Sequence, residues 1–249
     1  MSANKSCFPL QLPASTTFHK NFLAFLYTNI SAICWFLKRN LADKIAASGF
    51  FVVVPDYFHG DSYASEKGSI PDFLENHGPS YSKPQLLFLQ EKGFEDTKPL
   101  IAYLKSQGIS SIRVGGICRG GKVVAELGKT EEIQAAVMFH PSLVTIDDIK
   151  GNHHPYASVS FDCSQMDTTE AKVPTAILEA ETDQSSPPEL IKKFEEVLSV
   201  KKETNSFVKI FSGVGHGWTM RYKAEDEAAM KKAELAHTHM IEWFTTYVH

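Results

Sequence analysis

The chain has 249 residues, of which 43% are hydrophobic and 22% are charged, and its formal net charge is −4. This length suits one domain with a sizeable core, and the slightly acidic balance, with dispersed Lys and Arg, argues against binding to nucleic acid or to an anionic membrane. Four cysteines without the regular spacing of a disulfide framework favour a reducing compartment, so we expect a cytoplasmic protein.

The first 39 residues form an atypical N-terminal segment ahead of the main domain, which we assign to residues 40–249. Residues 21–37 are largely apolar between basic flanks, but this run is slightly short for a membrane span and contains polar residues. A signal anchor is one interpretation. We favour a displaced edge helix or an irregular segment over the core.

Strand-like and helix-like segments alternate after residue 40. A helix-like stretch begins at Asn40 and leads into an apolar strand that ends near His59, and similar pairs of segments follow towards the C-terminus. This alternation predicts an α/β fold, in which a mainly parallel sheet carries helices on both faces.

The pentapeptide Gly-Ile-Cys-Arg-Gly at residues 116–120 is the most informative motif of the chain. It follows an apolar strand at 112–115 and precedes a helix-like stretch at 121–127. A nucleophile between glycines on a sharp strand-to-helix turn is typical of the nucleophile elbow of α/β-hydrolases, here with Cys in place of Ser. Such a strained turn would project Cys118 from the sheet, and the Arg119 N–H at the helix start would stabilise an oxyanion. The alternative is an inert, buried Cys118 at the end of a glycine-rich strand.

A candidate acid follows the next clear strand, at residues 173–180. The loop after this strand carries Asp183, and α/β-hydrolases place their acid between the nucleophile and the histidine in chain order. Glu179 and Glu181 are rivals for this role, although Glu179 falls inside the strand pattern. An ordinary loop residue ahead of the helix-like stretch 189–194 is the alternative for Asp183.

A candidate base follows the last strand, at residues 207–211, where His216 lies between two glycines. His59 also ends a strand but precedes the nucleophile in the chain, and His140 is interpreted as part of a pocket wall. The His pair at 153–154 has no third ligand at helical spacing, so we expect no metal and no cofactor.

The elbow, the acid loop and the block from Phe207 to Trp243 resemble the dienelactone hydrolase family, most closely its plant members. The resemblance extends over most of the chain from Asn40 to the C-terminus, and it implies an α/β-hydrolase fold with Cys118, Asp183 and His216 as the triad. Members of this family cleave esters and lactones, and the founding activity opens dienelactone to maleylacetate. We therefore expect a carboxylic ester or lactone hydrolase that acts on a small molecule through a thioester acyl-enzyme.

Residues that bind the substrate are expected where strands end, because ligands bind at the carboxyl edge of such sheets. Tyr57, His59 and Trp218 have this placement. The family resemblance adds Arg221, just past the triad histidine, as a site for a substrate carboxylate. A solvated surface arginine is the alternative.

Three stretches depart from the family pattern. Residues 28–37 lack the motif of the loop that supplies the second oxyanion N–H in the family, and insertions are expected near 79–91 and 151–170. Because loss of one oxyanion donor costs about a hundredfold or more in rate, a catalytically silent scaffold with a binding or regulatory role is the second hypothesis. A redox-sensing Cys118 is a third. No pattern in the sequence indicates the oligomeric state.

Overall fold

The structure is a computed structural model that describes residues 23–27, 34–55, 83–151, 173–201, 204–223 and 225–247. Tyr57, His59 and all but the first residue of the stretch 151–170 lie outside the described residues. The strands are β1 (Leu23–Tyr27), β2 (Phe51–Val53), β3 (Ile112–Ile117), β4 (Ala135–Phe139), β5 (Thr175–Thr182) and β6 (Ser206–Gly215). The helices are α1 (Cys34–Ala47), α3 (Lys83–Ser106), α4 (Gly120–Gly128), α5 (Ile146–Lys150), α6 (Pro188–Ser199) and α7 (Glu227–Thr246).

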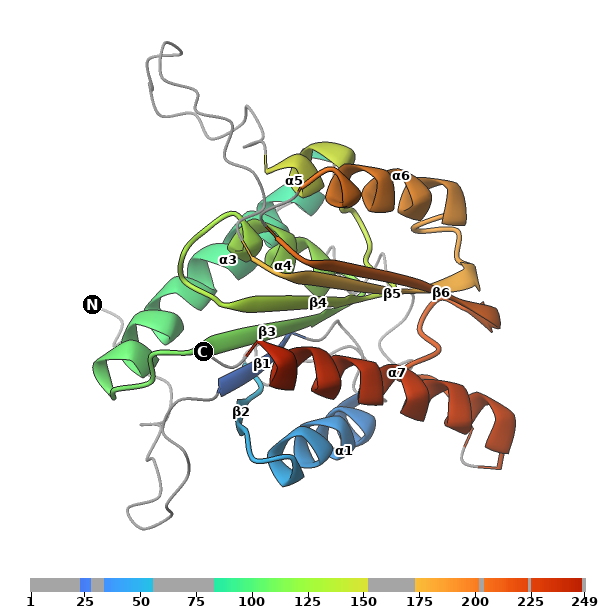
Figure 1. The fold of residues 1–249 in the computed structure, drawn as a ribbon, viewed down its shortest axis with the longest axis horizontal. Coiled ribbons are helices and arrows are strands. Elements are labelled where there is room, and N and C mark those ends of the chain that lie inside the picture. Colours follow the sequence, from blue (N-terminus) through green and yellow to red (C-terminus); the bar gives the residue numbers. More distant parts are fainter. Residues whose placement is uncertain are drawn as a thin grey trace, which may run out of the picture.

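The described strands form one sheet in the order β2-β1-β3-β4-β5-β6, and every neighbouring pair is parallel. Figure 1 shows helices on both faces of this sheet, with α3, α4, α5 and α6 on one side and α1 and α7 on the other. This arrangement confirms the α/β-hydrolase fold expected from the sequence. All strands point the same way, so the loops after β3, β4, β5 and β6 leave the sheet at one edge.

Two hydrophobic clusters fill the space between the sheet and its helices. One lies under α3, α4, α5 and α6, and the other lies under α1 and α7. Every residue of β3 and β4 is buried, as expected for central parallel strands that are covered on both faces. The rigid centre of the sheet therefore carries the elbow.

The N-terminal apolar run corrects one expectation. Its residues Leu23–Tyr27 form β1, which pairs with β2 on one side and with β3 on the other. These five residues are therefore neither a displaced edge helix nor an irregular cover, because the strand pairs with a neighbouring strand on each side, whereas Cys34 begins α1. Across the described residues, no helix combines the length and the apolar character that a membrane crossing requires.

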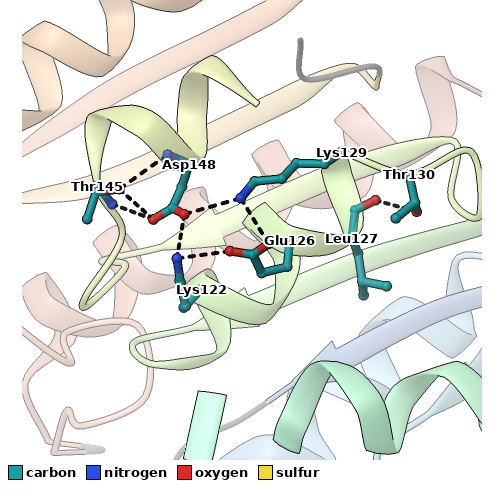
Figure 2. A network of polar contacts seen from close by, with 7 residues as sticks. All are labelled: Lys122, Glu126, Leu127, Lys129, Thr130, Thr145 and Asp148. Carbon is teal, nitrogen blue, oxygen red and sulfur yellow. Dashed lines mark hydrogen bonds and ion pairs between the residues drawn. The ribbon is translucent and has the colours of Figure 1, made fainter. Parts of the chain in front are cut away.

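A buried ionic network fastens α4 to α5 (Figure 2). Lys122 of α4 and Lys129, which follows the last residue of that helix, both contact the carboxylate of Asp148, and Glu126 accepts from each of these lysines at 2.9 Å. The other Asp148 oxygen accepts from the backbone N–H of Thr145 at 2.8 Å, which caps α5. Burial opposes ionisation of Asp148, but the charge and hydrogen bond of Lys122, the Thr145 N–H and the Lys129 charge together lower the pKa of Asp148 to about 2. These contacts connect α4, the helix that begins at the elbow, to α5.

Candidate active site

The predicted elbow is present at the end of β3. Cys118 has a φ of +57°, in the left-handed region that a side chain rarely adopts. A Cβ on Gly116 would lie 2.3 Å from the Gly120 carbonyl oxygen, so the strand and the helix approach too closely for any side chain there. The Cys118 carbonyl accepts from the N–H groups of Gly121 and Ser142, at 3.0 and 2.9 Å. These bonds hold the strained turn in place.

The structure brings the three expected triad side chains together. His216 follows β6 and places its Nε2 3.0 Å from the Cys118 Sγ. Its Nδ1 lies 2.6 Å from Oδ2 of Asp183, which follows β5. The Asp183 side chain is fully buried, whereas 21% of the His216 side chain is exposed. The contacts of Cys118, His216 and Asp183 are therefore consistent with the order of nucleophile, base and orienting acid that covalent catalysis requires.

The electrostatics of the site favour a thiolate and an imidazolium. Burial alone would raise the pKa of Cys118, but the hydrogen bond and the charge of His216 outweigh burial and lower that pKa. Burial alone would lower the pKa of His216, but contacts with Asp183 and Cys118 raise it to about 10. These shifts favour the thiolate form of Cys118 beside a charged imidazole, and the thiolate is the nucleophilic form of cysteine.

The Asp183 carboxylate is oriented by its own loop. Its Oδ1 accepts from the N–H of Ser185 at 2.7 Å and from the N–H of Ser186 at 3.3 Å. Of its two rivals, Glu181 is exposed and accepts from the N–H of Gly213 at 2.8 Å. The second rival, Glu179, is buried beneath Asp183. Asp183 is therefore the carboxylate that contacts His216.

Two further residues surround the sulfur and the imidazole. His140, expected in a pocket wall, is only 1% exposed, and its ring lies 4.8 Å from the His216 ring at 69°. Burial lowers the pKa of His140 to about 3, so its ring is neutral. The Ser142 hydroxyl lies 3.3 Å from the Cys118 Sγ. The sequence analysis missed Ser142, although its position just past the strand after the elbow was a usable signal.

The remaining predicted residues have different surroundings. The Arg119 backbone N–H hydrogen-bonds to the Cys118 sulfur, which favours the thiolate. The Arg221 side chain lies over Gly217, because a Cβ there would be 3.0 Å from its Cδ. Trp218 is only 6% exposed, and its ring packs against Phe211 with centroids 4.4 Å apart. Arg221 thus lies beside the triad, whereas Trp218 belongs to the core.

The position of β1 bears on the second oxyanion donor. Tyr27, the last residue of this strand, is paired with Gly116 of the elbow strand. The chain therefore leaves the sheet beside the elbow, and the stretch 28–33 that follows lies outside the described residues. Within the described ranges, no group of three or more His, Cys, Asp or Glu side chains is arranged to hold a metal ion.

Comparisons with known proteins agree with this geometry. The sequence model of the dienelactone hydrolase family matches residues 36–248. An endo-1,3;1,4-beta-D-glucanase of Zea mays is 38% identical over 167 residues, which cover 67% of this chain but only 45% of the maize protein. A carboxymethylenebutenolidase homolog of Mus musculus is 27% identical over 212 residues, which cover 84% of this chain and 76% of the mouse protein.

A solved structure shares the fold. The crystal structure of a putative dienelactone hydrolase from Klebsiella pneumoniae superposes with a TM-score of 0.67, covering 94% of this chain and 90% of that one. The sequence identity is 16%, so this likeness establishes the architecture alone.

Proposed function

This chain belongs to the dienelactone hydrolase family, and we propose that it hydrolyses a carboxylic ester or lactone through a triad of Cys118, His216 and Asp183. The observation that carries the proposal is the continuous contact from the Cys118 Sγ through both nitrogens of His216 to Oδ2 of Asp183, at 3.0 and 2.6 Å. These contacts lie within the reach that proton transfer requires.

The proposed reaction starts from a Cys118 thiolate beside a His216 imidazolium. The Cys118 thiolate attacks the acyl carbon, and the carbonyl π electrons move onto the oxygen. The Arg119 N–H at the start of α4 supplies one donor to this oxyanion. When the intermediate collapses, the C–O bond breaks and the His216 imidazolium gives its proton to the leaving oxygen. This leaves a thioester on Cys118.

Deacylation uses the same base. Neutral His216 removes a proton from water, the hydroxide attacks the thioester, and the carboxylic acid leaves as the thiolate is restored. Asp183 does not change its charge; it holds the Nδ1–H so that Nε2 faces the reacting atoms. With a lactone the leaving oxygen stays tethered to the acyl group, so one product carries both the acid and the hydroxyl.

Two features indicate the class of substrate. Arg221 places an exposed cation beside the triad, which suits a small substrate that carries a carboxylate. The relatives named carboxymethylenebutenolidase homologs point to a lactone. A reactive thiolate also suits a reducing compartment, so we propose a cytoplasmic enzyme.

The glucanase name of the maize relative does not fit this site. Glycosidases use two carboxyl groups that flank the scissile bond. The two carboxyl groups at this site, Glu179 and the triad's own Asp183, are 0% and 3% exposed and lie next to each other. Neither buried carboxyl group is accessible to a sugar substrate, so we favour ester or lactone cleavage for this chain.

The test is turnover of p-nitrophenyl acetate by the wild type and by Cys118→Ala, with mass spectrometry of the acylated protein. We expect an acetyl group on the peptide that contains Cys118, and a loss in the variant of about a thousandfold or more. A folded wild type with neither turnover nor adduct would overturn the proposal. The silent scaffold would then be the better hypothesis.

A further inference from the structure

A second carboxyl group lies directly behind the triad and has no part in the mechanism above. Glu179 is in β5 and is 0% exposed. Its Oε1 accepts from the N–H of Ala180 at 2.7 Å. Its Oε2 accepts no hydrogen bond from any group in the described part of the chain. The Asp183 carboxylate acts on this carboxyl group and raises its pKa, so the two acids lie next to each other.

A hydrogen bond between two carboxyl groups requires a proton on one of them. Asp183 accepts two backbone N–H bonds on Oδ1 and faces His216 with Oδ2, and these contacts stabilise its ionised form. Within the described residues Glu179 accepts only from the Ala180 N–H, so the proton between the two carboxyl groups belongs to Glu179. Burial, opposed by that N–H and helped by the charge of Asp183, raises the pKa of Glu179 to about 9.

Among the described residues the His216 charge also acts on Glu179 and lowers its pKa, but it has less effect than burial, which raises it. Residues alternate along β5, so Glu179 shares the face of Ile177, which packs under α6, and points away from α7. The end of β4 contributes His140, which is neutral, and the end of β6 contributes His216. The charged side chains of α6 are exposed: Glu189, Lys192, Lys193, Glu195 and Glu196. Among the described residues no Lys or Arg is paired with Glu179.

We propose that Glu179 is a positioning residue of the triad: a neutral acid that donates its proton to Asp183 and so holds that carboxylate against His216. The proposal rests on the hydrolase function above. It gives Asp183 one more donor besides the two loop N–H groups and the His216 Nδ1–H. When Glu179 loses its proton, two adjacent buried carboxylates repel each other, and the hold on His216 is lost.

Two variants of Glu179 separate the effect of its donated proton from the effect of its side-chain size. Glu179→Gln keeps an acceptor for Ala180 and a donor for Asp183 but does not titrate, whereas Glu179→Met has a similar length and no donor. We expect Glu179→Met to lower kcat by about 10–100-fold with little change in KM, as for other residues that orient a catalytic group. Glu179→Gln should recover most of that loss. Equal kcat values in Glu179→Met and the wild type would overturn the proposal.

The pH profile gives a readout that a purely structural role would not move. In the wild type kcat should fall above about pH 9, where Glu179 ionises. In Glu179→Gln the fall should move to about pH 10, where His216 loses its proton. Superimposable alkaline limbs in the two proteins would contradict the assignment.

Infrared spectroscopy tests the proton without any substrate. The wild type at pH 7 should show the carbonyl stretch of a protonated carboxylic acid, which Glu179→Gln lacks and which disappears as the pH passes about 9. Absence of this band would refute the proposal. The band without ester turnover would instead count against the hydrolase function and leave the Glu179–Asp183 pair standing.

Discussion

Substitution of Gly116 by alanine tests how closely the elbow is packed. The new Cβ would lie 2.3 Å from the Gly120 oxygen, 2.5 Å from the Gly120 carbonyl carbon and 2.5 Å from Cγ2 of Val124. Carbon atoms pack at about 3.5–4 Å, so the closest contact is short by more than about 1 Å. The closest partner is backbone, so the strain cannot be relieved by a side-chain rotation. The start of α4 must move, and Cys118 moves with it.

The expected costs follow from this displacement. Overpacking of this kind destabilises a protein by about 1–3 kcal/mol, which in a chain of this size lowers Tm by about 2–4 °C per kcal/mol. A misplacement of about 1 Å at a reacting group costs on the order of a hundredfold in rate. We therefore expect Gly116→Ala to lose about a hundredfold in kcat/KM on p-nitrophenyl acetate and to melt several degrees lower.

Gly128, the last residue of α4, offers a matched control. A Cβ on Gly128 would lie 3.7 Å from Cγ2 of Val173, which is ordinary contact. Because alanine has less freedom to lose than glycine, Gly128→Ala should keep full activity and gain about 0.4–1 kcal/mol. Thermal melts and steady-state kinetics of the two variants test the predicted changes in stability and activity. A Gly116→Ala variant with wild-type Tm and turnover would refute the packing argument.

Three further predictions concern the charges of the site. Asp183→Asn should lower kcat by about a thousandfold or more, because the imidazole loses the group that fixes its tautomer; wild-type kinetics would contradict the triad. Ser142→Ala should move the pH dependence of Cys118 alkylation by iodoacetamide to higher pH, because the Ser142 contact lowers the pKa of that thiol; an unchanged alkylation profile would remove Ser142 from the site. The folded protein keeps the Glu179 proton up to about pH 9, whereas the unfolded chain releases it near 4.5, so stability should fall as the pH rises through that window. Glu179→Gln should flatten this slope and melt higher at pH 8, which calorimetry at several pH values measures.

Local chemistry explains why much of the site could be predicted from the sequence. The elbow needs glycines on both sides of Cys118, and that requirement is written within five consecutive residues. Asp183 and His216 were found because each follows an apolar strand, and parallel strands bring such loops to one edge of the sheet. The order of these segments along the chain was therefore enough to propose Cys118, Asp183 and His216, with Glu179 and Glu181 left as rivals for the acid.

The N-terminal strand was missed for a physical reason. Leu23–Tyr27 is five apolar residues long, and so short a run has no period that separates a strand from a buried helix. Its state is decided by pairing with β2 and β3, which are distant in the sequence. Propensity alone does not contain that information.

The fold class, the elbow and the expected order of nucleophile, acid and base could be predicted from the sequence, because each depends on local turn chemistry or on the alternation of strands and helices. The folded structure was needed to see which carboxylate contacts His216 and that Ser142 lies at the sulfur. It also decided that Glu179 is buried against Asp183. Protonation depends on burial and on neighbours brought from other strands, and these exist only once the chain has folded.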